Sequence, residues 1–273
     1  MKPILYGALA AYVVAAIHAI LAFVTKRRSV ERVAVLALGC GFIAHTGALV
    51  ADWIEDGHYP LLHLHETISF LGWTLVIAYA LSVYYYRAQQ ALGIFLLPLV
   101  AGLVFLSNLV RGNSDLLLSG RVTEGETAWL FPIHTTLLLF AYAAFFVAFA
   151  ASVMYLLQER ELKLKTFSPI FHRLPPLNTV DDIGSTAAGI GFTLLSLGII
   201  TGVIWSSSRN GRMWHNDPIE IFAVLTWVVY LALIHYRAQW RGRKAAWIGV
   251  LGFALVACTL VGALLMGGYH VFG

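Results

Sequence analysis

The stretch Trp129–Leu157 reads WLFPIHTTLLLFAYAAFFVAFAASVMYLL and contains no lysine, arginine, aspartate or glutamate. Because a helix needs about 20 apolar residues to cross the hydrocarbon core of a bilayer, this stretch predicts a membrane-spanning helix. Seven further stretches have the same character: Ile4–Val24, Val33–Trp53, Thr67–Tyr86, Leu92–Leu109, Ser185–Trp205, Ile219–Tyr236 and Ala245–Met266. The sequence therefore predicts an all-α fold, a polytopic membrane helix bundle of about eight transmembrane helices.

The composition of the whole chain leads to the same conclusion. Of its 273 residues, 59% are hydrophobic and 12% are charged, and its mean hydropathy is +0.78. An ordinary soluble domain has roughly 45–50% apolar and about 25% charged residues, so a water-soluble globule is excluded. We expect one integral membrane domain over residues 1–273, surrounded by membrane lipid. The basic residues form short clusters beside the apolar stretches, which argues against a nucleic-acid partner.

The loops between the predicted spans differ in their positive charge. One set of loops holds 13 of the 18 lysine and arginine residues, and the other set holds 5. By the positive-inside rule the first set is cytoplasmic, which places both termini on the outer, periplasmic side of a bacterial inner membrane. This topology predicts a long cytoplasmic loop at 158–184 and an outer loop at 205–220.

Histidines are frequent for a membrane protein, since the chain has ten of them. Ionisable groups at membrane depth are costly unless they pair with or bind something. His18, His45 and His235 lie inside predicted spans, whereas His134 and His270 lie at the outer surface. Two interpretations stay open. Each buried histidine hydrogen-bonds a neighbouring helix, or pairs of neutral imidazoles ligate heme iron at one outer site and one site within the bilayer.

Position along the helix favours metal ligation by His134. It follows Pro132 in the first turn of its span, where the positive end of the helix dipole disfavours imidazolium and leaves a lone pair on the ring. A zinc site formed by His63, His65 and Glu66 in the first outer loop is a separate hypothesis for the histidines of that loop. The spacing of these three residues matches no familiar zinc pattern.

The outer loop at 205–220 combines a helix start with aromatic and basic residues. Asp217 as N-cap, Pro218 at the first helical position and Glu220 three residues after the cap predict a helix beginning there. Two tryptophans, Trp205 and Trp214, and two arginines complete the loop. Tryptophans are common interface anchors, but they also make flat walls for a porphyrin. The guanidinium groups of Arg209 and Arg212 could pair with the propionates of that porphyrin.

Four stretches of the chain resemble the cytochrome c assembly family, which includes the CcsA subunit of cytochrome c synthase, the heme-handling protein CcmC and HemX-type membrane proteins. Residues 174–206, LPPLNTVDDIGSTAAGIGFTLLSLGIITGVIWS, are similar to the family's glycine-containing segment that ends in tryptophan. Residues 211–235 resemble its tryptophan-rich WWD loop and the following helix. YPLLHLHETISFLGW at 59–73 resembles its outer-loop motif, and GGYHVFG at 267–273 resembles its closing Gly-x-His motif.

The resemblance implies that this chain handles heme b. His134 and His270 match the two external histidines that ligate heme beside the WWD loop, and His235 matches the intramembrane histidine. His45 resembles the second-helix histidine of small HemX-like members and is our choice as the mate of His235, with His18 as competitor by its depth.

The WWD loop itself matches the family in part. Trp214, Asp217, Pro218 and Glu220 are in place, whereas Asn216 stands for a tryptophan. A lysine of the family motif is also replaced, by Ile219.

These features lead to three hypotheses of function. In the first, the chain carries or presents heme at the outer face for cytochrome c assembly, at most as one component of a heme-attachment synthase and with no catalytic residue of its own. Its partners would then be apocytochrome c and a CcsB/ResB-like subunit. In the second, a HemX-like regulator binds a heme-biosynthesis enzyme through the loop at 158–184. In the third, the chain is a polytopic transporter that does not use heme.

Overall fold

The fold was analysed in a computed structural model that describes residues 2–86, 89–110, 129–165, 171–236 and 239–265. Eight of its helices are long and apolar enough to cross a membrane. Their bounds are Lys2–Thr25 (α1), Arg28–Asp56 (α2), Leu64–Tyr86 (α3), Gln89–Val110 (α4), Leu130–Leu164 (α5), Leu177–Asn210 (α6), Pro218–His235 (α7) and Arg243–Leu265 (α8). The described residues contain no strand, and the prediction of an all-α, multi-pass membrane helix bundle is confirmed.

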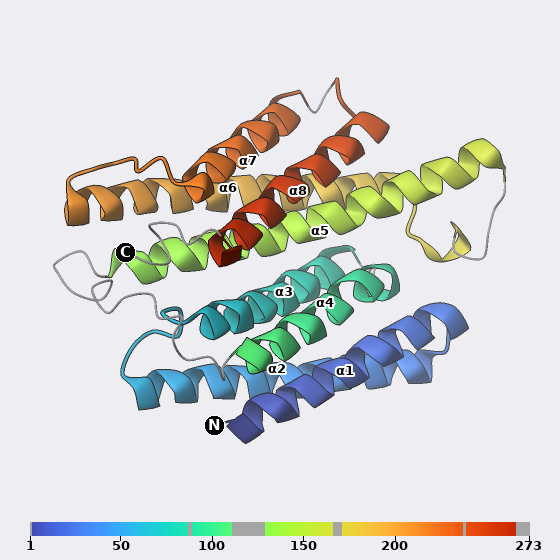
Figure 1. Cartoon of the computed structure of the whole chain (residues 1–273). Helices are drawn as coiled ribbons and strands as arrows, with labels where there is room; N and C mark the ends of the chain where they lie inside the picture. The colour runs from blue at the N-terminus through green and yellow to red at the C-terminus, as the bar shows by residue number, and fades with distance from the viewer. Residues whose placement is uncertain (1, 87–88, 111–128, 166–170, 237–238, 266–273) are drawn as a thin grey trace. The chain divides into compact units, whose positions relative to one another are not determined.

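Contacts divide these helices into two compact units. The first unit contains α1–α4 and a short 3-10 helix, η2 (Phe171–Arg173), and the second contains α5–α8. Within the first unit, α1 packs against α2 and α4, and α3 packs against α4 (Figure 1). Within the second, α5 packs against α6 and α8, and α8 packs against α7. The expectation of one integral domain over residues 1–273 stays a prediction.

Large apolar side chains point away from the protein interior in both units. Leu36 is 69% exposed and Ile43 is 73% exposed on α2, and Leu251 on α8 is 60% exposed. Such side chains cannot be left in water in this number, so their natural surroundings are lipid chains. Each helix therefore buries one face against its neighbours and presents another to the bilayer.

Helices α5 and α6 extend further than the sequence predicted. The loop expected at 158–184 is helical at both ends, because α5 continues to Leu164 and α6 begins at Leu177. The prediction failed there because it equated charged residues with loop, whereas charged residues also form helices outside the hydrocarbon. Lys163 Nζ forms an ion pair with Glu159 Oε1 at 2.6 Å, and the two residues are one helical turn apart. Such pairs stabilise a helix, which agrees with the extension of α5.

At its other end α6 also enters the predicted outer loop at 205–220. It runs to Asn210, so that residues 211–217 alone connect it to α7. Its 34 residues give a length of about 51 Å, compared with a hydrocarbon core of about 30 Å.

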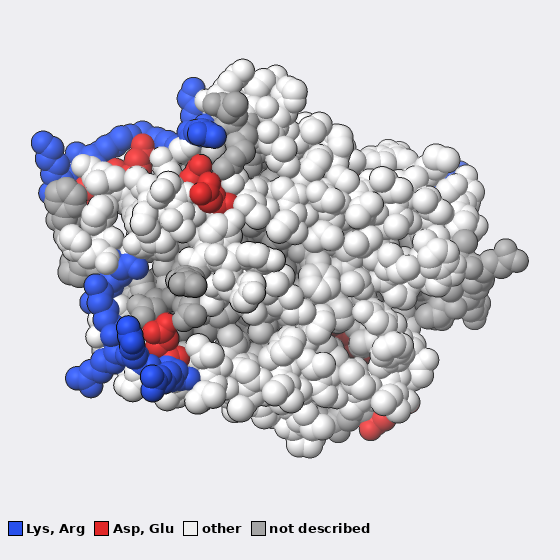
Figure 2. All heavy atoms as spheres, turned by 180° about the vertical axis from the view of Figure 1, so that it is seen from behind, with Lys and Arg blue, Asp and Glu red and all other residues white. Residues whose placement is uncertain are grey.

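Lysine and arginine side chains gather at one end of the helices in each unit (Figure 2). In the first unit, Lys26, Arg27 and Arg28 lie at the connection between α1 and α2. Arg173 of η2 donates a hydrogen bond to the Phe23 carbonyl at 2.6 Å, near the same end of α1. In the second unit, Lys163, Lys165, Arg243 and Lys244 lie at the end of α5 and the start of α8, whereas Arg212 lies between α6 and α7. This distribution is the one that the positive-inside rule uses, and the orientation that it implies stays a prediction.

Candidate functional site

His134 lies in the first turns of α5 and is held by α6. Its Nδ1 lies 2.7 Å from the backbone carbonyl oxygen of Gly198. Because a carbonyl oxygen only accepts hydrogen bonds, Nδ1 carries the hydrogen, and the neutral ring has its lone pair on Nε2. Metal-binding histidines are commonly oriented in this way, with one ring N–H donated to a carbonyl or carboxylate and the other nitrogen used as ligand.

Two glycines of α6 allow the imidazole to lie this close to the helix. A methyl group at position 202 would lie 2.5 Å from Cε1 of His134, and one at position 198 would lie 2.7 Å from Cδ2 of Leu138. Gly198 and Gly202 form a Gly-x-x-x-Gly sequence, the spacing that lets two membrane helices approach closely. Further along the same pair of helices, Gly191 accommodates the ring of Phe145, 2.6 Å from where its methyl group would be.

An aromatic contact lies next to His134 on the same helix pair. Phe131, one turn before His134 on α5, packs against Trp205 of α6 with ring centroids 5.3 Å apart. Trp205 is 3% exposed. The structure thus brings together two of the predicted site residues, His134 and Trp205, although Trp205 is a buried packing residue and not a free wall.

The start of α7 has the predicted capping arrangement. Asp217 accepts a hydrogen bond from the backbone N–H of Ile219 at 2.9 Å, and Glu220 accepts from the backbone N–H of Asp217 at 3.4 Å. Pro218 is the first helical residue, where its missing N–H costs nothing. The prediction that a helix begins here is confirmed.

We expect Asp217→Ala to reduce stability by about 0.5–2 kcal/mol, because the first turn of α7 loses its cap. Asp217→Ser is the matched control, since a serine hydroxyl can accept the same hydrogen bond and the variant should keep wild-type stability. Unfolding of the purified protein in detergent measures both variants. Equal unfolding curves for Asp217→Ala and the wild type would contradict the role of the cap.

The other residues of this loop are more exposed. Trp214 is 44% exposed, and its Nε1 donates to Asn216 Oδ1 at 2.7 Å. Asn216 has φ 59°, a left-handed conformation that asparagine tolerates better than a tryptophan would. Arg212 is exposed, and the side chain of Arg209 lies outside the described residues. An exposed tryptophan and an exposed arginine thus lie in one short segment, and their predicted contacts with a porphyrin stay a prediction.

His215, for which the sequence predicted no role, lies among polar partners in this loop. Its Nδ1 lies 3.2 Å from Glu220 Oε1 and 3.4 Å from Ser206 Oγ, and its backbone N–H donates to Glu220 Oε2 at 2.9 Å. Glu220 therefore both closes the capping box and fixes the His215 ring. The spacing of histidine and glutamate around a helix start is a signal that could have pointed to this contact.

In the first unit, His45 is fully buried between three helices. Its Nε2 lies 2.8 Å from Ser69 Oγ of α3, and its Nδ1 lies 3.2 Å from the Tyr12 hydroxyl of α1. Both ring nitrogens thus have hydrogen-bond partners. This is the arrangement expected of a histidine that joins neighbouring helices, and ligation of iron would require one of these bonds to open, at about 0.5–1.5 kcal/mol.

The remaining predicted ligands have different surroundings. His235 is the last residue of α7 and is exposed, with its ring 4.9 Å from that of Tyr236. His18 is half-buried, and its Nδ1 donates to the Val14 carbonyl of its own helix at 2.8 Å. His270 lies outside the described residues. Whether His235 pairs with His45 or His18 stays a prediction.

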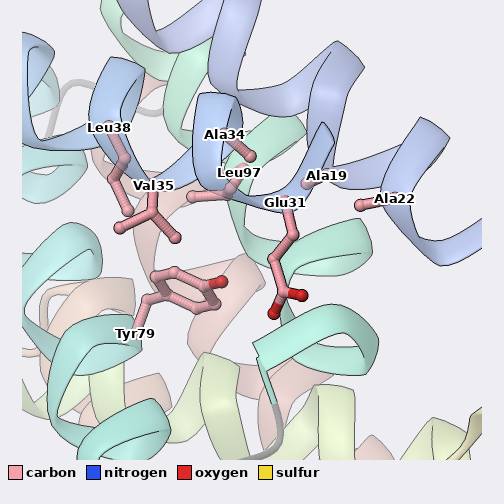
Figure 3. A pocket seen from close by; sticks show the side chains of 8 residues that line it. All are labelled: Ala19, Ala22, Glu31, Ala34, Val35, Leu38, Tyr79 and Leu97. Atoms are coloured by element: carbon pink, nitrogen blue, oxygen red, sulfur yellow. The ribbon is translucent and has the colours of Figure 1, made fainter. Parts of the chain in front are cut away.

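A separate pocket in the first unit carries no heme ligand (Figure 3). Glu31 and Tyr79 turn their polar ends into this space, and the rest of its lining is aliphatic (Figure 3). Its lining residues are Ala19, Ala22, Glu31, Ala34, Val35, Leu38, Tyr79 and Leu97. Since none of them is a histidine, this pocket does not serve the predicted iron ligation.

The fold and the site together define a class: a multi-pass membrane protein in which a histidine is fixed at a close contact between two helices. The sequence model of the family described as Cytochrome C assembly protein matches residues 61–270. The chain belongs to this family. The match includes His134, His235 and His270 and begins after the region that contains His45.

Individual relatives agree with the family match. The cytochrome c biogenesis protein CcsA of Guillardia theta is 28% identical over 249 residues, which cover 85% of this chain and 82% of the relative. CcsA of Gloeobacter violaceus is 25% identical over 289 residues, covering 87% and 85% of the two chains. CcsA of Saccharum officinarum is 25% identical over 300 residues, covering 96% and 92%.

Proposed function

We propose that this chain acts in cytochrome c assembly as a membrane protein that binds heme b and carries or presents it at the outer face of the membrane. The observation that carries the proposal is the hydrogen bond from His134 Nδ1 to the Gly198 carbonyl, because it orients the ring and leaves the lone pair on Nε2. Membership of the cytochrome c assembly family supports the proposal that the bound metal is the iron of heme.

The proposed division of roles follows the depth of each residue. His134 and His270 ligate iron at the outer face, beside the loop that contains Trp214 and Arg212. Arg209 and Arg212 pair with propionates, and the cap at Asp217 holds the loop in position. Two histidines saturate the axial positions of heme iron and suppress oxygen chemistry there.

The inner site is proposed to use His235 with His45. Because His45 is bonded to both Ser69 and Tyr12, its use as a ligand requires a rotation of the ring or a shift of α1 or α3. His18 needs a smaller change, since its Nδ1–H bond to Val14 leaves the lone pair of a neutral ring on Nε2. Single substitutions of His45 and His18, read out by the heme spectrum, distinguish the two.

We expect the full-length protein purified in detergent to carry heme, or to take it up, with the Soret band of a six-coordinate low-spin species. A protein that shows no Soret band, even after addition of heme, would overturn the proposal and leave the heme-independent transporter. Heme binding together with normal cytochrome c levels in a deletion strain would instead favour the HemX-like regulator. The described contacts give no support to either alternative.

We also propose that the basic ends of the helices face the cytoplasm of a bacterial inner membrane, with both chain termini on the periplasmic side. We expect Asp56→Cys to react with a membrane-impermeant maleimide in intact cells and Lys165→Cys to react after lysis alone. The native Cys40 and Cys258 are first replaced by serine, since both are exposed. The opposite labelling pattern would invert the topology and move His134 to the inner side.

The proposed partners are the acceptor of heme and a companion subunit. The acceptor is apocytochrome c, whose thiols bond to the heme vinyl groups in a synthase. The chain itself contributes position and orientation to that step, since we assign it no acid or base. A CcsB/ResB-like subunit is the proposed companion.

A further inference from the structure

Three histidine rings and a buried carboxylate lie close together between the end of α2 and the first turn of α3. The ring of His63 lies 5.6 Å from that of His58 and 5.3 Å from that of His65, centroid to centroid. His58, His63 and Glu66 also bring possible ligand atoms to within 4.8 Å of one another. Among the described residues, no other group of three histidine, cysteine or acidic side chains is this close.

The carboxylate of Glu66 is fixed on both of its oxygens. One oxygen accepts the backbone N–H groups of Leu62 and His63, at 2.9 and 3.0 Å. The other accepts Nδ1–H of His63 at 2.8 Å. Glu66 is 3% exposed, so it is a buried anion that holds the His63 ring in one orientation.

His58 and His63 present the same nitrogen. Nδ1 of His58 donates to the Tyr59 carbonyl at 3.3 Å, as Nδ1 of His63 donates to Glu66. Because both partners only accept, the neutral rings carry their lone pairs on Nε2. Donation of one ring N–H to a carboxylate or carbonyl is the usual outer-sphere arrangement of a metal-binding histidine.

The backbone of this cluster is anchored from two sides. The buried Ser107 of α4 donates its hydroxyl to the carbonyl of His65 at 2.8 Å. Thr67 donates its hydroxyl to the carbonyl of His63 at 3.3 Å. The ligand positions are therefore set by packing and by hydrogen bonds, as a preformed metal site requires.

The ring separations agree with shared ligation of one ion. Two imidazoles bound to a tetrahedral Zn²⁺, with each nitrogen about 2.0–2.1 Å from the metal, have ring centroids about 5 Å apart. Imidazole nitrogen favours Zn²⁺, Cu²⁺, Ni²⁺ or Co²⁺ over Mg²⁺ and Ca²⁺. We propose that His58 and His63 bind a divalent transition cation, with Glu66 as the residue that positions His63.

This proposal does not rest on heme binding. The sequence alone grouped His63, His65 and Glu66, without His58, as an alternative zinc site whose spacing matches no familiar zinc pattern. The structure groups His58 with His63 and Glu66. In this proposal the glutamate supports a ligand, because it accepts the Nδ1–H of His63. The site would fasten the segment that follows α2 to the start of α3.

The test uses full-length protein in detergent, stripped of metal with a chelator and titrated with Co²⁺ and then Zn²⁺. We expect one equivalent of Co²⁺ with the intense visible absorption of tetrahedral coordination, displaced by one equivalent of Zn²⁺. His58→Ala and His63→Ala should each weaken binding at least tenfold, whereas His172→Ala, an exposed histidine elsewhere, should not. Glu66→Gln keeps an acceptor for the backbone N–H groups and should weaken binding by about 10- to 100-fold at unchanged melting temperature.

The unmodified chain alone can overturn the proposal, so the result does not depend on whether a variant folds. Absence of a tetrahedral Co²⁺ spectrum, or Zn²⁺ uptake no greater than that of the His58→Ala/His63→Ala double variant, would refute the site. The titration is repeated after heme is added. Stoichiometric release of Zn²⁺ by heme would assign these histidines to heme and refute a separate cation site, while unchanged Zn²⁺ binding in a protein that takes up no heme would refute the proposed function alone.

Discussion

His134→Ala should remove the heme held at the outer face and reduce the amount of mature cytochrome c at least tenfold. The imidazole is the proposed heme ligand, and its Nδ1–H bond to the Gly198 carbonyl fixes the ring and places the lone pair of the neutral ring on Nε2. Heme content per purified chain and heme-stained cytochrome c in a deletion strain complemented with the variant measure the two effects. Alanine at this position keeps the helix intact, because alanine is the best helix former.

The exposed His172 provides the control for this substitution. His172→Ala removes an imidazole without touching a proposed ligand and should leave both heme content and cytochrome c at wild-type levels. If His134→Ala retained a full complement of low-spin heme, the histidine would be a packing residue and the outer site would lie elsewhere.

Gly202→Ala should have nearly the same effect, although glycine offers no ligand. The added methyl group would lie 2.5 Å from Cε1 and 2.7 Å from Nδ1 of His134, so the ring has to leave its position and its bond to Gly198. Substitutions that disturb the support of a metal ligand commonly cost about 10- to 100-fold in affinity. We expect a loss of that size in heme affinity, measured by titration of the purified protein with heme.

Gly189 offers a matched control on the same helix. A methyl group there meets nothing within 4 Å, so Gly189→Ala makes the same chemical change without the clash. It should bind heme like the wild type and gain slight helix stability. Equal heme affinity of Gly202→Ala and Gly189→Ala would show that the position of the His134 ring does not matter for binding.

The helices could be predicted from the sequence because each is a long apolar stretch bounded by charge. Each of the eight predicted spans overlaps one helix among the described residues. The polar ends of α5 and α6 were not predicted to be helical. Hydropathy indicates where the apolar segment ends, but a helix can continue beyond that point into water. Residues such as Glu159 and Lys163 are polar and still helical.

Local features of the site were likewise predictable, while contacts between distant residues were not. Asp217, Pro218 and Glu220 are neighbours in sequence, and their capping box follows from residue type alone. The partner of His134 is 64 residues away in the chain, and no local pattern names it. The Gly-x-x-x-Gly spacing at Gly198 and Gly202 was the available signal for a close helix contact.

The histidine cluster at the start of α3 could likewise be predicted only in part. The sequence placed His63, His65 and Glu66 together because they are adjacent, but spacing could not say which group orients which. The bonds of Glu66 to backbone N–H groups and to His63 depend on how the chain turns at the start of α3. His58 joins the cluster through that turn.

The contacts between α5 and α6 follow a fixed register. Three residue pairs define this register: Phe145 with Gly191, Leu138 with Gly198, and His134 with Gly202. Each step toward the start of α5 is matched by a step of the same number of residues toward the end of α6, as expected of two antiparallel helices. Slippage by one turn, about 5.4 Å, would unseat every pair at once. The position of the His134 ring along the helix axis therefore depends in part on Gly191, about 16 Å away along α6. A single methyl group added at Gly191 would shift α5 along α6 and displace His134 without touching it.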